Sequence, residues 1–163
     1  MTAAGSWRAA PRTPLRERVL PGYTRGQERA NMITHIVGGG LGVVILVLAL
    51  LISALHRNIW GIVSGGIYGA AMVCLFTVSS VYHGLPLCYG KLVMQVLDHC
   101  VIYLLIAGTY TPVLLSALRP EHPALAWTLF GVEWGLAAVA AALTAIDLKK
   151  YKALSMVCYV GMG

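Results

Sequence analysis

The sequence predicts an all-α protein that crosses the membrane several times, and three observations support this fold class. Apolar residues make up 58% of the 163 residues and charged residues only 11%, against about 25% in an ordinary soluble domain. The mean hydropathy is +0.76. Four runs of sequence are long and apolar enough to cross a bilayer. So few charges cannot give a small soluble domain its polar exterior, and intrinsic disorder requires low hydrophobicity.

Each predicted span contains the roughly 20 mostly apolar residues that a bilayer requires. The first two spans carry no charged residue, and the third and fourth carry one acid each, Asp98 and Glu133. A fifth apolar stretch is about half as long as a span, which is typical of a chain cut short within its fifth span. The predicted spans are about 36–55, 60–82, 94–118, 124–146 and, in part, 153–163.

Basic residues flank the apolar runs and predict the orientation. Residues 1–27 contain three prolines, Pro11, Pro14 and Pro21, and show no helical periodicity. This indicates a disordered basic cytoplasmic tail before a transmembrane domain at 28–163. With the N-terminus inside, ten basic residues lie inside and two, Arg57 and Arg119, lie outside. The positive-inside rule therefore predicts a multi-pass protein of the cell membrane with a cytoplasmic N-terminus. No apolar run of seven residues precedes residue 36, so a cleaved signal peptide is not expected.

Net charge and cysteines exclude other classes of function. The net charge is +6, but the bases flank apolar runs, so the expected partner is the lipid bilayer and not nucleic acid. The four cysteines are scattered and form no CxxC motif, so neither a disulfide framework nor a cysteine metal site is predicted.

Small residues on the second span predict its packing face. Gly61, Gly65 and Gly69 repeat every four residues, a spacing that lets another helix approach closely. Ser79 follows Gly61 by 18 residues, or five full turns, and His83 lies one turn further on. We therefore expect His83 to face the interior of the bundle.

The predicted topology brings three ionisable groups, His35, His83 and Asp98, to the inner level of the membrane. Ionisable groups inside a bundle are costly and usually functional. A histidine and an aspartate at one level fit a metal site, a proton relay or a hydrogen-bonded pair that fixes helix packing, and the residues leave all three open. His99 faces about 100° away from Asp98 on a helix, so it is a poor third metal ligand.

Polar residues elsewhere predict further contacts. Glu28, Asn31 and His35 share one helical face just before the first span. They form either a polar first turn at the membrane interface or a lid or support beneath the inner site. Glu133, in the middle of the fourth span, is predicted to be protonated and hydrogen-bonded or paired across the bundle. Pro112 is predicted to kink the third span, with a threonine hydroxyl bonding a freed carbonyl.

Three blocks of sequence resemble the hemolysin III family, the bacterial branch of the progestin and adipoQ receptor family. The blocks are E-x-x-N-x-x-T-H at 28–35, S-S-V-Y-H at 79–83 and L-D-H-C-V-I-Y-L-L-I-A-G-T-Y-T-P at 97–112. The resemblance covers about residues 22–163 and rests on the order and spacing of the blocks.

The resemblance implies a seven-helix protein with its N-terminus inside and zinc near the cytoplasmic face. It assigns His83 as a zinc ligand and Asp98 as the residue that holds the zinc-bound water. It assigns Ser79 either to catalysis or to support of the ligands from behind. Kinship with alkaline ceramidases implies a zinc-dependent hydrolase of a lipid amide, with Asp98 as general base. The family takes its other two zinc ligands from an H-x-x-x-H on the seventh helix, and these 163 residues contain no such motif.

Two other functions stay open. The family name points to a membrane-permeabilising, haemolytic protein, although the sequence shows no amphipathic insertion segment. The third possibility is a receptor or structural membrane protein without catalysis.

Overall fold

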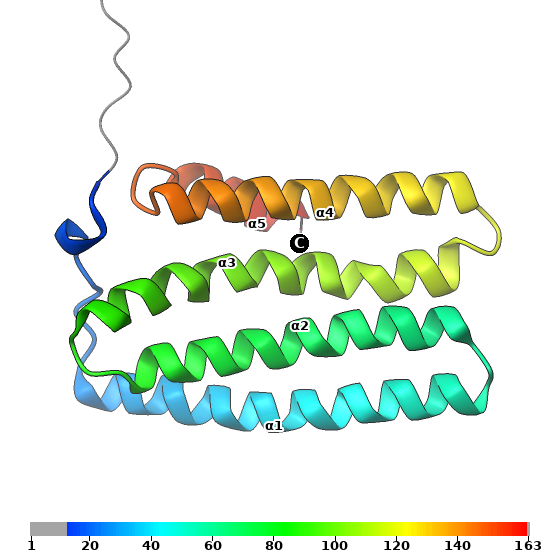
Figure 1. Ribbon diagram of the computed structural model, residues 1–163, viewed down its shortest axis with the longest axis horizontal. Coiled ribbons are helices and arrows are strands. Elements are labelled where there is room, and N and C mark those ends of the chain that lie inside the picture. Colours follow the sequence, from blue (N-terminus) through cyan, green and yellow to red (C-terminus); the bar gives the residue numbers. More distant parts are fainter. Residues whose placement is uncertain (1–12, 163) are drawn as a thin grey trace, which may run out of the picture.

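The computed structural model describes residues 13–162, and within that range it contains helices and no strand. The long helices are α1 (Arg25–Leu55), α2 (Ile59–Gly84), α3 (Tyr89–Pro112) and α4 (Pro123–Ile146). The shorter elements are η1 (Leu15–Glu17), the π-helical η2 (Val113–Leu118), which continues α3, and α5 (Lys152–Met162). Helices α1 to α4 lie side by side in chain order, and α5 packs against α3 and α4 (Figure 1).

The predicted all-α, multi-pass fold is confirmed. Four helices of the described chain are long and apolar enough to cross a membrane: α1, α2, α3 together with η2, and α4. They contain the four predicted spans. Helix α5 is shorter, with 11 residues.

Helix α1 begins at Arg25, whereas the sequence analysis assigned residues up to 27 to the tail. The reason is a capping box at Thr24 and Gln27. The Gln27 backbone N–H donates to the Thr24 hydroxyl at 3.3 Å, and the Thr24 backbone N–H donates to the Gln27 side chain at 2.8 Å. Both donors would otherwise lack partners at a helix start, so the helix extends well beyond the predicted span.

Residues 13–24, called the strap here, cross one end of the bundle. The Thr13 backbone N–H donates to the Asp147 carboxylate at 2.9 Å, and the Arg18 guanidinium donates to the Ile146 carbonyl at 2.8 Å. Backbone N–H groups of Thr13, Lys150 and Lys149 hold the pKa of Asp147 at about 2, because hydrogen bonds to a carboxylate favour its charged form. In the structure, residues 13–24 of the predicted tail thus contact the end of α4, while residues 1–12 lie outside the described residues.

The face of α2 that carries Gly61, Gly65 and Gly69 packs on α1. A Cβ atom at Gly69 would lie 2.7 Å from the Cβ and 3.0 Å from the Cα of Leu46, and one at Gly65 would lie 3.2 Å from the Cβ of Ala49. Small residues are needed here because the two backbones approach so closely. Further along α2, Ser79 is also buried.

A hydrogen bond between side chains joins the end of α3 to the middle of α4, where Glu133 also lies. The Thr111 hydroxyl donates to the Ala107 carbonyl at 2.8 Å and accepts from the Trp134 indole N–H at 3.1 Å. Helix α3 widens into η2 directly after Pro112. The Oε2 atom of Glu133 is buried without a hydrogen-bond partner among the described residues, so neither predicted contact of Glu133 is seen there.

Candidate functional site

The start of α1, the end of α2 and the start of α3 meet at one end of the bundle, called the His83 end here (Figure 1). The Glu28 carboxylate joins all three helices. Its Oε2 lies 2.6 Å from Nδ1 of His83, and its Oε1 lies 2.9 Å from Nζ of Lys91. The side chains of His83 and Lys91 are only 8% and 3% exposed. Buried charges are tolerated when they are paired in this way.

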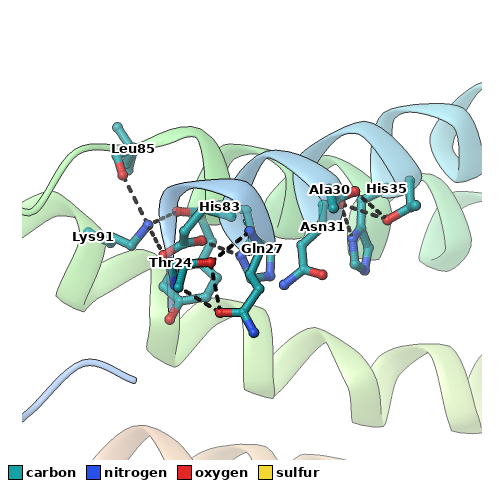
Figure 2. Close-up of polar contacts among 11 residues, drawn as sticks. Thr24, Gln27, Ala30, Asn31, His35, His83, Leu85 and Lys91 are labelled. Carbon is teal, nitrogen blue, oxygen red and sulfur yellow. Dashed lines mark hydrogen bonds and ion pairs between the residues drawn. The ribbon is translucent and has the colours of Figure 1, made fainter. Parts of the chain in front are cut away.

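Lys91 uses all three of its ammonium donors. Besides Glu28, its Nζ donates to the carbonyls of Tyr82 at 3.1 Å and Leu85 at 3.0 Å, and it lies 5.0 Å from the centre of the Tyr82 ring. Figure 2 shows Lys91 reaching towards Leu85 beside His83. A cation at the C-terminal end of a helix is favourable, so Lys91 ties the start of α3 to the end of α2.

The sequence analysis missed the structural role of Lys91, because it counted this residue as a loop charge. A signal was present. Lys91, Gln95 and Asp98 follow each other at i, i+4 and i+7, the spacing of one helical face. Lys91 and Gln95 are both buried, so this polar stripe of α3 faces the bundle.

The Glu28 contact fixes the chemistry of the His83 ring. Because a carboxylate accepts at Nδ1, that nitrogen carries the proton, and the neutral ring presents Nε2 as its lone-pair donor. Three rings surround the imidazole, with centroid distances of 4.8 Å to Tyr82, 5.8 Å to His35 and 5.9 Å to Tyr23. The orientation of His83 is thus set by one hydrogen bond and by aromatic packing.

The face of α1 predicted from Glu28, Asn31 and His35 turns towards α2. The His35 ring is stacked on His83 with an interplanar angle of 25°. The Asn31 backbone carbonyl lies 2.6 Å from Nδ1 of His35 and holds that ring in place (Figure 2). These residues support the His83 site by contact and packing.

The other two predicted catalytic residues are placed differently. Ser79 is buried on α2, one turn before His83, with 4% of its surface exposed. Asp98 is half-buried on α3. Among the contacts of the described residues none joins Asp98 to His83, and the acid in contact with His83 is Glu28. The catalytic roles of Ser79 and Asp98 stay predictions.

The ligand set can be compared with the requirements of zinc. A zinc-bound histidine usually donates its second ring N–H to a carboxylate, and His83 with Glu28 has this arrangement. A catalytic zinc ion needs about three protein ligands, and no group of three His, Cys, Asp or Glu side chains in the described residues could hold a metal. The described residues therefore contain one histidine with this arrangement and do not form a zinc site by themselves.

Fold and site together define a multi-pass α-helical membrane protein with a buried ionisable cluster between its first three helices. A model of the family described as "Haemolysin-III related" matches residues 23–163. The chain belongs to the hemolysin III family, as the three sequence blocks predicted.

Relatives with curated descriptions agree with this assignment. The chain is 36% identical over 141 residues to the "Hemolysin-3 homolog" of Bacillus subtilis and 34% identical over 137 residues to "Hemolysin-3" of Bacillus cereus. It is 30% identical over 160 residues to the human "Monocyte to macrophage differentiation factor". These matches cover 86%, 84% and 93% of this chain but 65%, 61% and 63% of the relatives. No solved structure matches the chain.

Proposed function

We propose that the protein is a zinc-dependent hydrolase of the cell membrane that cleaves the amide bond of a lipid. The hydrogen bond between Glu28 and Nδ1 of His83 carries this proposal. It fixes the tautomer in which Nε2 is free to bind a metal, and such support raises the metal affinity of a histidine. The family resemblance assigns His83 to zinc, and the geometry agrees with that role.

The site is proposed to face the cytoplasm. The strap and the cluster at Lys149, Lys150 and Lys152 lie at the same end of the bundle as His83, and basic segments favour the cytoplasmic side. His83 is at the last turn of α2, so its level is that of the membrane interface. The linkage between the headgroup and the acyl chain of a lipid lies at this depth.

The residues divide into positioning groups and candidate catalytic groups. Glu28 and His35 contact the His83 ring, and Lys91 holds the Glu28 carboxylate. Hydrolysis adds a hydroxyl to the acyl carbon, breaks the C–N bond and transfers a proton from water to the leaving amine. A carboxylate can carry that proton, and Asp98 is the proposed base.

The test measures bound zinc and lipid amide hydrolysis in the complete gene product, reconstituted in nanodiscs with a fluorescent ceramide as probe. His83→Ala is expected to lose both zinc and turnover. Asp98→Asn is expected to keep zinc and lose about 100-fold or more of the rate, the size of a general-base contribution. His122→Ala, an exposed residue at the opposite end, is the matched control.

A well-folded, zinc-free wild-type protein would overturn the proposal. So would full turnover in His83→Ala. If the wild type hydrolyses no lipid amide but releases dye from liposomes more strongly than an unrelated multi-pass protein does, membrane permeabilisation replaces hydrolysis as the function.

A further inference from the structure

A cavity of about 700 Å³ opens at the His83 end. The strap, the first turns of α1 and the loop between α2 and α3 form its walls, and Glu28, His83 and Lys91 line it. Small-molecule sites usually measure about 300–1,000 Å³, so the cavity is large enough for a ligand group. It gives direct access to the ionisable cluster.

The free charge on the cavity wall is positive. Among the described residues, Glu28 is the only acid that lines the cavity, and the Lys91 ammonium already neutralises that carboxylate at 2.9 Å. Arg25 and Arg29 also line the cavity, three residues before and one residue after Glu28 on α1. Both arginines are exposed, and neither guanidinium group has a hydrogen bond or ion pair within the part of the chain that the structure describes. Two guanidinium groups are therefore available to a ligand.

The remaining wall is apolar. Leu20, Leu85 and Leu87 line the cavity together with the adjoining prolines, and Leu87 is 82% exposed. Exposed leucines around the charged groups would not contribute to binding a small, hydrated anion. A lipid needs both surfaces, because its charged headgroup must sit beside an apolar chain.

We propose that this cavity binds the phosphate-bearing headgroup of an anionic lipid, with Arg25 and Arg29 as the groups that contact the phosphate. Planar guanidinium groups bind phosphate oxygens with two parallel hydrogen bonds, and the positive end of α1 adds a favourable field. The inference rests on the proposed function only in naming the substrate class, which would be a phosphate-bearing lipid whose acyl chain is linked through an amide. Arg25, Arg29 and His83 line the same cavity, and binding of the headgroup does not require hydrolysis.

The test is a titration of the complete gene product in phosphatidylcholine nanodiscs, followed by calorimetry. The probes are dihexanoyl phosphatidylglycerol, dihexanoyl phosphatidylcholine and inorganic phosphate. The wild type is expected to bind the anionic lipid at least about tenfold more tightly than the zwitterionic one, because each charged hydrogen bond contributes on this scale. The double variant R25Q/R29Q is expected to lose the preference, and R25K/R29K to keep part of it.

The matched control is K149Q/K152Q. It removes two charges from the same end of the bundle but from residues that do not line this cavity, so it is expected to keep the preference. Equal binding of the two lipids by the wild type would overturn the inference. So would an equal loss in K149Q/K152Q, since the effect would then be a general charge effect of the surface.

Inorganic phosphate distinguishes the source of the anion. If it binds as tightly as phosphatidylglycerol and displaces it, the site recognises free phosphate and the assignment to lipid is wrong. Binding is measured without turnover. A protein that binds the anionic lipid but hydrolyses nothing would overturn the proposed activity alone, and a hydrolase indifferent to headgroup charge would overturn this inference alone.

Discussion

Replacing Glu28 by glutamine removes the carboxylate that both Lys91 and His83 contact. The Lys91 ammonium, only 3% exposed, then keeps its two carbonyl partners but loses its counter-charge. Removing one partner of a buried ion pair costs about 3–5 kcal/mol. Glu28 is 19% exposed, so water reaches part of the pair, and we expect Glu28→Gln to lower the free energy of unfolding by about 3 kcal/mol, at the lower end of that range.

The assay is reversible unfolding by SDS in mixed micelles, followed by circular dichroism. Glu121→Gln is the matched control, because Glu121 is exposed at the opposite end of the bundle, and its expected effect is within about 0.5 kcal/mol. The double variant Glu28→Gln/Lys91→Met removes both charges. We expect its loss in free energy of unfolding to be smaller, by at least about 1 kcal/mol, than the sum of the losses in Glu28→Gln and Lys91→Met.

A loss in Glu28→Gln no larger than in Glu121→Gln would refute this reasoning. Additive effects in the double variant would refute it as well. Either result would mean that the cluster does not hold the three helices together as the distances indicate.

Three further predictions test the packing, the strap and the orientation. Gly69→Ala is expected to destabilise the fold by about 1–3 kcal/mol through overpacking against Leu46, whereas Gly131→Ala, whose new Cβ meets nothing within 4 Å, is not. The pKa of Asp147 is lowered from 3.8 to about 2. The charged Asp147 carboxylate therefore stabilises the strap fully above about pH 4, and this stabilisation is lost as the pH falls through 2. Asp147→Asn should speed tryptic cleavage of the strap at neutral pH. A variant that keeps only the exposed Cys88 should react with an impermeant maleimide from the cytoplasmic side; reaction from the outside only would reverse the orientation.

The number and the type of helices could be predicted from the sequence because each span is a long apolar run, and length alone distinguishes such a run from a buried soluble helix. The start of α1 could not be read from hydropathy. It depends on the reciprocal hydrogen bonds of Thr24 and Gln27, a local signal in polar residues that the apolar pattern does not contain. The strap was missed for a different reason, since its anchor at Asp147 is more than a hundred residues away in the sequence.

The candidate site could be predicted in part. Helical spacing placed His83 and Ser79 on the packing face of α2, and Glu28 with His35 on one face of α1. Which acid contacts His83 depends on how far each helix is rotated about its axis, and spacing along one helix does not contain that information. Lys91 completes the cluster because the turn between α2 and α3 folds it back onto the Tyr82 and Leu85 carbonyls, a contact that only the structure shows.

The most direct test of the proposed function is the zinc affinity of the complete gene product with and without the Glu28 carboxylate. Competition with a chelator would give the dissociation constant for the wild type, Glu28→Gln and Glu121→Gln, each checked for native helix content. We expect one zinc ion per wild-type chain and an affinity about 10–100-fold lower in Glu28→Gln, with Glu121→Gln unchanged. Equal affinities in all three proteins, or no zinc in the wild type, would contradict the role of Glu28 in preparing His83 for a metal.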